Sequence, residues 1–300
     1  AVNNFFDPKN QHTVKVLPFL GEYSWSVVIA SLVLAFCVAA VLIGGVKRIA
    51  SVSQIIVPFM AVIYIVFVLV LVVCNITAVP AAFATIVKAA FSPKAITGGA
   101  VGSFLVAMQK GVARGIFSNE AGLGSAPIAA AAAQTKEPVR QGLVSMTGTF
   151  IDTIVICTLT GLSIVLTGAW QVDGLEGVQV TTYAFQNGLP FPKELSAFVL
   201  MLCLVFFAFT TILGWDYYSE RCLEYLSGGR MKYVMVYRWI YILAVFIGPY
   251  MTVSAVWTIA DIFNGLMALP NMIALFALSG VVVKETKHFF ERHRNGEIED

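Results

Sequence analysis

The amino-acid sequence predicts an all-α polytopic membrane protein. Of its 300 residues, 58% are hydrophobic and only 12% are charged, whereas soluble domains carry about 25% charged residues. The apolar residues form runs of about the 20 residues that a membrane-spanning helix needs, the first of them from Tyr23 to Ile43. The net charge of +2 is too small to indicate nucleic-acid binding. These observations exclude a soluble domain.

Taken in order, the chain begins with a polar segment, residues 1–24, which we expect to form an extracellular loop or a short surface helix. Seven predicted spans follow, and a polar tail covers residues 281–300. The spans are expected at 23–43, 55–74, 98–133, 143–166, 195–215, 233–247 and 253–278.

One apolar segment is too short to span the membrane. From Ala81 to Phe91 the spacing places Phe83, Ile86 and Val87 on one helical face, together with Ala90. A short helix with one apolar face is typical of the membrane interface. We therefore predict an interfacial helix here, between the second and third spans.

The third span, 98–133, is interrupted by residues that do not favour a spanning helix. Its glycines lower helix propensity, and it also contains Arg114, Asn119 and Glu120. Ionisable residues inside a membrane mark a functional site by default, and non-helical backbone is tolerated there only in contact with protein or water. We predict a helix, a break from about Phe117 to Gly124, and a second helix. The alternative is a loop between two short helices at the membrane surface.

The ends of such half-helices can bind ions. They expose N–H and C=O groups that hold an anionic carboxylate and a small cation at the midplane. The N–H groups from Gly122 to Ser125 suit a substrate carboxylate, with Ser125 as the N-cap of the second helix and Pro127 in its first turn. The freed carbonyls near Phe117 and Ser118 suit an ammonium group or a sodium ion.

Enzymatic chemistry has little support in the sequence. The three histidines, His12, His288 and His293, all fall outside the spans, which excludes a histidine metal site or proton relay within the membrane. The sequence contains neither HExxH nor GxSxG, the motifs of metalloproteases and serine hydrolases. We expect a transporter that needs no cofactor rather than an enzyme.

Loop charges predict the orientation. Cytoplasmic loops carry an excess of Lys and Arg. One set of alternate loops and the tail holds Lys47, Arg48, Lys136, Arg140, Arg221, Arg230, Lys232, Arg238, Lys284, Lys287, Arg292 and Arg294, and the other side holds only Lys9, Lys15, Lys88, Lys94 and Lys193. We therefore predict a multi-pass protein of the cytoplasmic (inner) membrane whose C-terminus is cytoplasmic and whose broken third span crosses the lipid bilayer once.

The segment Arg114–Ser125, RGIFSNEAGLGS, resembles the signature of the alanine or glycine:cation symporter (AGCS) family, the sodium:alanine symporters. Shorter matches follow the same order at Gly45–Ile49 with Val57–Met60, Phe150–Cys157, Phe209–Trp215 and Leu266–Asn271. The resemblance covers all but the first twenty-odd residues. It implies sodium-coupled symport of small neutral amino acids by alternating access, with Na⁺ as the coupling ion.

The resemblance also implies a LeuT-type fold of two inverted five-helix repeats, each with a discontinuous first helix. Residues 98–280 then form the second repeat, whose broken helix is 98–133, and residues 25–97 hold the last two helices of the first repeat with the interfacial helix. The first repeat is truncated. We expect the chain to be the C-terminal portion of a symporter whose missing N-terminal helices are its partner, and to be inactive in transport by itself.

By position, the resemblance assigns the substrate site to Phe117, Asn119, Gly122, Thr211 and Trp215. It places a sodium site at the adjacent hydroxyls of Thr210 and Thr211. Ordinary structural readings remain open for three of these residues. Helix carbonyls can satisfy both hydroxyls, Trp215 can belong to an interfacial aromatic belt, and Phe117 can be a packing residue.

The charged residues of the spans need partners, because leaving one buried and unpaired costs several kcal/mol. Arg114 and Glu120 can pair across the break, and Asp152 and Asp261 are further carboxylates in spans. We expect Arg114, Glu120 and Asp152 to form a structural and gating network rather than to bind substrate. A neutral pocket suits alanine, whose own charges cancel.

Three other functions remain as alternatives. A proton-coupled amino acid permease of the same fold is the first, although the Thr210–Thr211 pair favours sodium and a lysine in that place would favour the proton. An ion channel could use a broken helix, but no filter sequence is present. A purely structural membrane subunit would need neither the break nor the charges. The sequence leaves open alanine versus glycine, enantiomer, stoichiometry and oligomeric state.

Overall fold

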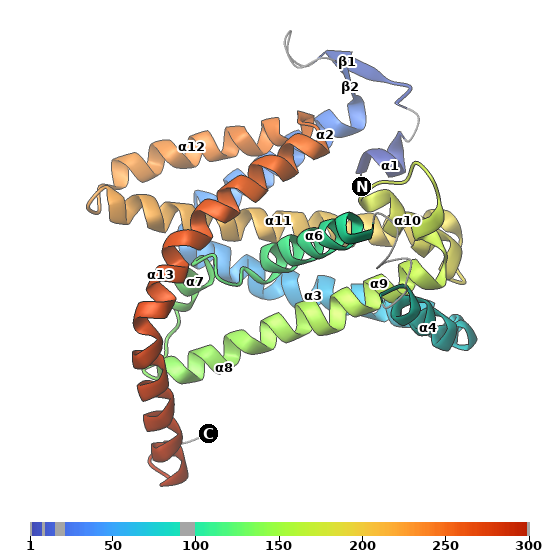
Figure 1. The fold of residues 1–300 in the computed structure, drawn as a ribbon. Coiled ribbons are helices and arrows are strands. Elements are labelled where there is room, and N and C mark those ends of the chain that lie inside the picture. The colour runs from blue at the N-terminus through green and yellow to red at the C-terminus, as the bar shows by residue number, and fades with distance from the viewer. Residues whose placement is uncertain (1, 8–9, 16–21, 91–99, 299–300) are drawn as a thin grey trace. The chain divides into compact units, whose positions relative to one another are not determined.

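A computed structural model of the protein describes residues 2–7, 10–15, 22–90 and 100–298 (Figure 1). The described chain is almost entirely helical, and six of its helices are long and apolar enough to cross a membrane. These are Trp25–Leu42, Gly45–Cys74, Pro138–Leu166, Lys193–Leu226, Met231–Tyr250 and Val253–Arg294. The all-α, multi-pass architecture expected from the sequence is confirmed.

The chain divides into two compact units, which we describe one at a time. Unit 1 comprises residues 1–89 and 159–252, and unit 2 comprises residues 90–158 and 253–300. The predicted broken helix lies in unit 2, whereas the Thr210–Thr211 pair lies in unit 1.

Unit 1 begins with a small folded segment rather than a plain loop. Helix α1 (Val2–Phe6) precedes the antiparallel strands β1 (Thr13–Lys15) and β2 (Glu22–Ser24). The side chain of Asp7 joins these pieces, because its carboxylate accepts hydrogen bonds from Ser24 Oγ at 2.7 Å and from the backbone N–H of Gln11 at 2.9 Å. These two bonds lower the pKa of Asp7 below its usual value of 3.8.

Helix α11 (Lys193–Leu226) is the centre of unit 1. It packs against α2 (Trp25–Leu42), α3 (Gly45–Cys74), α10 (Val178–Gly188) and α12 (Met231–Ile247) (Figure 1). The packed core contains Val38, Val41, Leu42, Ile49, Phe209 and Leu213. Short elements complete the unit, namely η1 (Ile76–Ala78), α9 (Thr158–Leu166), η3 (Ala169–Gln171) and η4 (Gly248–Tyr250).

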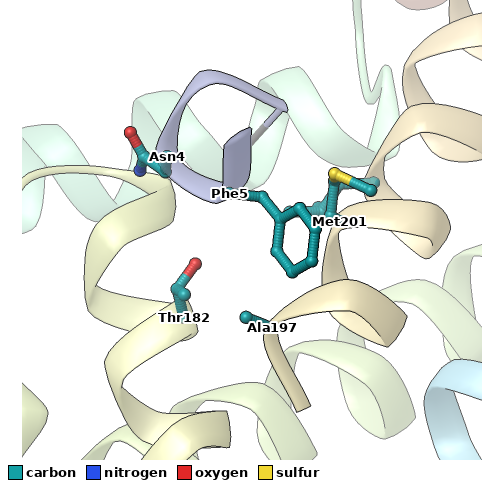
Figure 2. A pocket seen from close by; sticks show the side chains of 6 residues that line it. Asn4, Phe5, Thr182, Ala197 and Met201 are labelled. Carbon is teal, nitrogen blue, oxygen red and sulfur yellow. The ribbon is translucent and has the colours of Figure 1, made fainter. Parts of the chain in front are cut away.

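The N-terminal part of α11 is covered by α1. Phe5 of α1 lies beside a small pocket between α10 and α11, as Figure 2 shows. The pocket is lined by Asn4, Phe5, Thr182, Ala197, Met201 and Leu204. This contact anchors residues that the sequence alone suggested only as a loop or a surface helix.

The helix boundaries differ from the expected spans in one consistent way. The span expected at 55–74 begins at Gly45, and the one expected at 195–215 continues to Leu226, so the connection between α11 and α12 is only residues 227–230. Hydropathy detects the apolar part of a helix, whereas hydrogen bonding continues through polar residues beyond the membrane-spanning part.

The expected interfacial helix is present as α4 (Val79–Ala90). Phe83, Ile86 and Val87 are 47%, 42% and 54% exposed, so their apolar face is not packed against other described residues. A helix with such a face suits the membrane surface, and its position there stays a prediction.

Unit 2 contains α6 (Ala100–Asn119), α7 (Ala126–Ala130), α8 (Pro138–Thr149), the π-helix η2 (Phe150–Cys157) and α13 (Val253–Arg294). Helix α13 extends well beyond the span expected to end at residue 278, so most of the tail is helical. Arg292 near its end forms an ion pair with Glu137, with Nη1 and Oε1 3.0 Å apart. Residues 98 and 99, where we expected the broken span to begin, lie outside the described part.

Candidate functional site

The break in the predicted third span is present, and it begins at Glu120, three residues later than expected. Helix α6 ends at Asn119, and α7 begins at Ala126. Three residues between them have positive φ, namely Glu120 at 54°, Gly122 at 78° and Gly124 at 81°. Glycine adopts this conformation without strain, so Gly122 and Gly124 allow the chain to stay non-helical after Glu120.

Two details of the break differ from the sequence-based expectation. The second half-helix, α7, is only five residues long, although the alanine-rich segment suggested a longer one. Ser125 occupies its N-cap position with Pro127 in the first turn, but its side chain makes no capping bond. Its Oγ instead donates to Glu120 Oε2 at 2.7 Å, which closes the loop on itself.

The break leaves backbone groups available. Within the described residues, no hydrogen bond uses the N–H groups of Gly122 or Gly124 or the carbonyl oxygens of Phe117 or Ser118. The N–H of Leu123 is satisfied by the carbonyl of Glu120 at 3.2 Å. Donors and acceptors of this kind are the groups that bind the two ends of an amino acid or a small cation.

Helix α13 approaches the break closely. A Cβ atom added to Gly124 would lie 3.1 Å from Oδ1 of Asn271, and one added to Gly122 would lie 3.9 Å from Sδ of Met272. Both partners follow Pro270, the proline inside α13, which removes one backbone donor from that helix. The matched segments 114–125 and 266–271 therefore meet in space.

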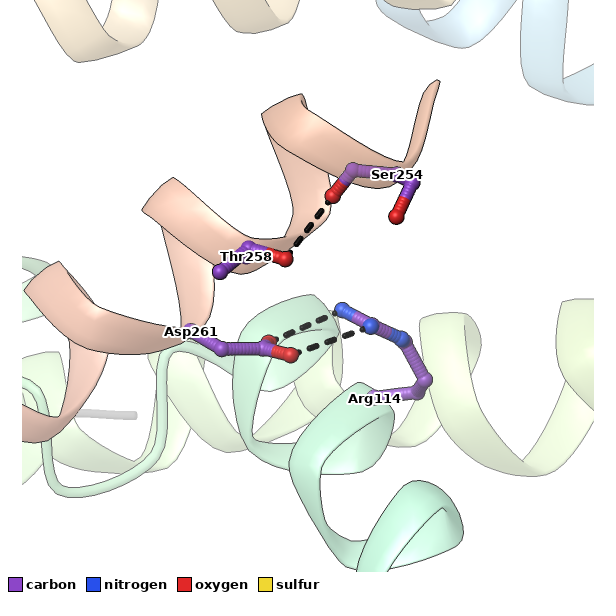
Figure 3. A network of polar contacts seen from close by, with 4 residues as sticks. All are labelled: Arg114, Ser254, Thr258 and Asp261. Atoms are coloured by element: carbon purple, nitrogen blue, oxygen red, sulfur yellow. Dashed lines mark hydrogen bonds and ion pairs between the residues drawn. The ribbon is translucent and has the colours of Figure 1, made fainter. Parts of the chain in front are cut away.

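Arg114 links α6 to α13 (Figure 3). Its Nη1 and Nη2 donate to Oδ1 and Oδ2 of Asp261 at 3.1 and 3.3 Å, and the two side chains are 33% and 36% exposed. Parallel bonds of this kind fix the relative orientation of the two groups. Figure 3 also shows Thr258, whose Oγ1 donates to the carbonyl of Ser254 within α13 at 2.9 Å.

Trp257 completes this contact. The guanidinium carbon of Arg114 lies 3.6 Å from the centre of its ring, and Phe117 meets the ring edge-to-face at a centroid distance of 5.4 Å. Cation–π and aromatic pairs are each worth about 0.5–1.5 kcal/mol. Phe117 thus has a packing partner in α13 whether or not it also contacts substrate.

The last turn of α6 is joined to η2. Ser118 Oγ donates to Asp152 Oδ2 at 2.6 Å, and Thr153 Oγ1 donates to Asn119 Oδ1 at 2.6 Å. A π-helix is uncommon and is often found at functional sites. Here its wider turn lets the consecutive residues Asp152 and Thr153 both face α6.

The pairing of Arg114 with Glu120, which the sequence left possible, is therefore not formed. Glu120 follows Arg114 by six residues, which puts it on another face of the helix, and its positive φ turns it further away. Arg114 is bound to Asp261, Glu120 to Ser125 and Asp152 to Ser118. The three charges surround the break in separate contacts, and their gating role stays a prediction.

The Thr210–Thr211 pair lies on α11 in unit 1. Thr210 Oγ1 donates to the carbonyls of Phe206 and Phe207 at 3.0 and 3.2 Å, while Thr211 is exposed and its hydroxyl has no hydrogen bond among the described residues. The Thr210 hydroxyl is thus bonded to carbonyls of its own helix, which is the ordinary structural role described above. Donation by the hydroxyl leaves its oxygen lone pairs free, so a cation can still bind them.

Trp215 lies within α11 rather than at the end of a helix. Its ring contacts Tyr218 edge-to-face at a centroid distance of 5.8 Å. The neighbouring Asp216, which follows the expected span 195–215, is completely buried. Glu220, which binds Arg238 of α12, is almost completely buried. Sequence reasoning missed this cluster, although the four-residue spacing of the two acids on a continuing helix was its signal.

Sequence reasoning also did not pair Asp261 or Trp257 with Arg114. The two positions are 147 residues apart for the ion pair, and nothing in their local sequence indicates the contact. The four-residue spacing of Trp257 and Asp261 places both on one face of α13, which was the available signal.

Comparisons with known proteins agree with this picture. The model of the sodium:alanine symporter family matches residues 9–300. The chain is 49% identical over 270 residues to the sodium/alanine symporter AgcS of Methanococcus maripaludis, covering 89% of this chain and 58% of the relative. It is 38% identical over 291 residues to a probable sodium/glutamine symporter, GlnT, of Bacillus subtilis, covering 97% and 59%.

A third relative is the sodium/proton-dependent alanine carrier protein of Bacillus sp. strain PS3, which is 35% identical over 267 residues, or 84% of this chain and 59% of the relative. The chain therefore spans somewhat less than two thirds of the length of these relatives. The family consists of symporters, in agreement with the expectation of a transporter rather than an enzyme. On the match over residues 9–300, the chain belongs to the sodium:alanine symporter family.

Proposed function

We propose that the protein takes part in the sodium-coupled symport of a small neutral amino acid, alanine or glycine, across the cytoplasmic membrane by alternating access. The observation that carries this proposal is the break at residues 120–125, which lies in the segment resembling the family signature. An unwound segment in a spanning helix is the usual way for a transporter to present backbone groups to substrate and ion.

The chemistry of the break favours a zwitterionic substrate. The unbonded N–H groups of Gly122 and Gly124 suit a carboxylate, and the unbonded carbonyls of Phe117 and Ser118 suit an ammonium group. The charge of Arg114 is already paired with that of Asp261, so Arg114 is not available to bind an acidic side chain of a substrate. Asn119 and Phe117 complete this half of the proposed substrate site.

In this proposal the substrate site is completed from α11 by Thr211 and Trp215, and Thr210 with Thr211 supplies hydroxyl oxygens to Na⁺. Oxygen ligands suit a hard cation such as sodium. Sodium bound there favours substrate binding, and substrate favours sodium to the same extent, because coupling between two sites is reciprocal. We propose further that residues 98–280 form the second repeat of a LeuT-type fold.

The proposal is tested by uptake of labelled alanine into proteoliposomes that contain the protein in its full natural length, with sodium or choline outside. We expect uptake to require sodium. Thr211→Ala should raise the half-saturating sodium concentration about tenfold, as expected for a lost ligand worth about 1.4 kcal/mol. Thr286→Ala is the matched control, because its Oγ1 is bonded to the carbonyl of Val282 in the distal part of α13.

A second candidate is coupling to protons. It is favoured by the relative from Bacillus sp. strain PS3, which is named a sodium/proton-dependent alanine carrier protein. Uptake that ignores sodium but follows a pH gradient would support this candidate and contradict the sodium site at Thr210 and Thr211. Competition by unlabelled glycine and glutamine would then separate the substrates, since another relative is a probable glutamine symporter.

A further inference from the structure

A buried carboxyl group in unit 1 has no role in the site described above. Asp216 of α11 is 0% exposed, and neither of its carboxyl oxygens has a hydrogen-bond partner among the described residues. Buried polar groups in folded proteins are nearly always hydrogen-bonded, so each exception asks for an explanation. For a carboxyl group the missing partner is a donor, a cation or a proton.

The nearest charged groups do not supply that partner. Glu220, one helical turn after Asp216, is 2% exposed and accepts two hydrogen bonds from Arg238 of α12, from Nε at 2.6 Å and from Nη2 at 2.9 Å. The positive charge of Arg238 is therefore directed at Glu220. The next basic residue on α11, Arg221, is bound to Glu224 at 2.5 Å.

The remaining ionisable groups near Asp216 are neutral. Tyr237 and Tyr241 of α12 face it, and the hydroxyl of Tyr241 donates to the carbonyl of Ile212 at 2.8 Å. The basic residues at the start of α3, Lys47 and Arg48, are exposed. The buried cluster thus combines two carboxyl groups with one guanidinium.

A cluster with this composition carries one excess negative charge if both carboxyl groups are ionised, and burying an uncompensated charge is strongly unfavourable. A metal cation would need several oxygen ligands. Glu220 is already bound to Arg238, the Tyr241 hydroxyl is bonded to the Ile212 carbonyl, and no group of three or more acidic, histidine or cysteine side chains gathers anywhere in the described chain. A proton needs only one oxygen.

We propose that Asp216 is a proton-binding site, held as a neutral carboxylic acid beside the Glu220–Arg238 ion pair. The bound proton faces the carboxylate of Glu220, one turn further along α11. When the proton leaves, the Asp216 carboxylate competes with Glu220 for Arg238. This weakens the Glu220–Arg238 ion pair that joins α11 to α12. Protonation therefore acts on the helix that also carries Thr210 and Thr211.

The test is infrared spectroscopy of this chain in lipid nanodiscs at pH 7, which requires no transport activity. A protonated carboxyl group has a C=O stretching band that an ionised carboxylate lacks. We expect this band in the wild type, its loss in Asp216→Asn, and its retention in the matched control Asp173→Asn, whose side chain is exposed in a loop. A band that Asp216→Asn leaves unchanged would overturn the proposal.

Isotope labelling tests the same point without a substitution, in case Asp216→Asn does not fold. The band should shift when aspartate is ¹³C-labelled at the side-chain carboxyl and should stay in place when glutamate is labelled. A shift with glutamate alone would assign the proton to Glu220 and contradict the proposal.

A final comparison separates a proton from a cation. The band should be the same in sodium and in choline buffers. If it appears only after sodium is removed, a bound cation neutralises Asp216 and the proposal is wrong. These readouts concern unit 1 alone, so a failure of the proposed amino acid symport would leave them unaffected, and the reverse also holds.

Discussion

The two charged regions of the molecule differ in how their charged side chains are paired and in how deeply these side chains are buried. Around the break in unit 2, Arg114 and Asp261 bind each other one to one and remain about one third exposed. Between α11 and α12 in unit 1, two acids lie near one base, which binds Glu220 and not Asp216, and all three side chains are at most 12% exposed.

The difference shows that burial, more than the number of charges, determines how much free energy is lost when a charged cluster is broken. A partly exposed pair gains little net energy where water reaches it and screens its charges. A buried cluster is held strongly, because breaking it leaves a charge without compensation. We therefore expect the α11–α12 contact to be more rigid than the break. Within that contact, Asp216 is the group whose protonation can change.

The largest effect should come from removing the base of the buried cluster. Arg238→Met leaves Glu220 buried without its partner, and we expect it to destabilise the protein by about 3–5 kcal/mol. Thermal unfolding in detergent measures the loss. The matched control is Arg221→Met, which breaks the Glu224 pair at 32% and 31% exposure and should cost no more than about 1 kcal/mol. Equal losses in the two variants would contradict the contrast.

Next in size is a substitution at the break itself. Gly124→Ala places a Cβ atom 3.1 Å from Asn271 Oδ1 at a φ of +81°, and a non-glycine residue in this conformation costs about 1–3 kcal/mol. Unfolding of the variant should show a loss in that range. Gly111→Ala, which meets no atom within 4 Å inside α6, should instead stabilise the helix by about 0.5–1 kcal/mol. If both substitutions destabilised the protein, the loss at Gly124 could not be assigned to its positive φ in the break.

A smaller effect is expected for the partly exposed pair. A double-mutant cycle with Arg114→Ala and Asp261→Ala should give an interaction energy of about 1 kcal/mol or less. The companion cycle with Arg114→Ala and Glu120→Ala should be additive, because these residues bind different partners. An interaction energy above about 3 kcal/mol for the first cycle would place Arg114 in surroundings as apolar as those of Arg238.

The smallest expected effect is the response of the N-terminal segment to acid. It depends on Asp7, which lies outside the membrane-spanning helices and can be compared with the acids of both regions. Its pKa is lowered by the Ser24 hydroxyl first and by the Gln11 N–H second. A lowered folded pKa means that its contribution is present above the ordinary value of 3.8 and is lost as pH falls through the folded value.

We therefore expect the N-terminal segment to loosen locally in acid below that value. The amide signal of His12, in a sample labelled at its three histidines, should report this change, because its N–H donates to Asp7 Oδ2 at 3.3 Å. Asp7→Asn should abolish the acid transition. An unchanged transition in that variant would assign it to another group.

Much of the architecture could be predicted from the sequence because its causes are local. Six of the seven expected spans correspond to long apolar helices, since twenty apolar residues leave few alternatives to a membrane helix. The break was expected because glycines lower helix propensity, and it lies at residues 120–125, where Gly122 and Gly124 have positive φ. The helix ends at Gly45, Leu226 and Arg294 were missed, because polar residues extend a helix without any hydropathy signal.

The candidate site was predictable only in part. Phe117, Asn119 and Gly122 were assigned to the substrate site because they lie within one continuous motif. The structure places them at the end of α6 and just after it. Their binding roles stay predictions. The partner of Arg114 was missed because Glu120 is near in sequence while Asp261 is near in space, and helix packing rather than chain proximity brings the ion pair together.

The sequence by itself determined that this protein is a helical membrane protein with one interrupted helix, because composition, hydrophobic run length and glycine chemistry act on neighbouring residues. Only the tertiary structure decided which charges are neutralised and which are not. From the sequence, Asp216 was expected in the charged connection between two spans, and the packing of α11 against α12 buries it completely. The energy of a charge depends on everything that surrounds it in three dimensions, and no local pattern contains that information.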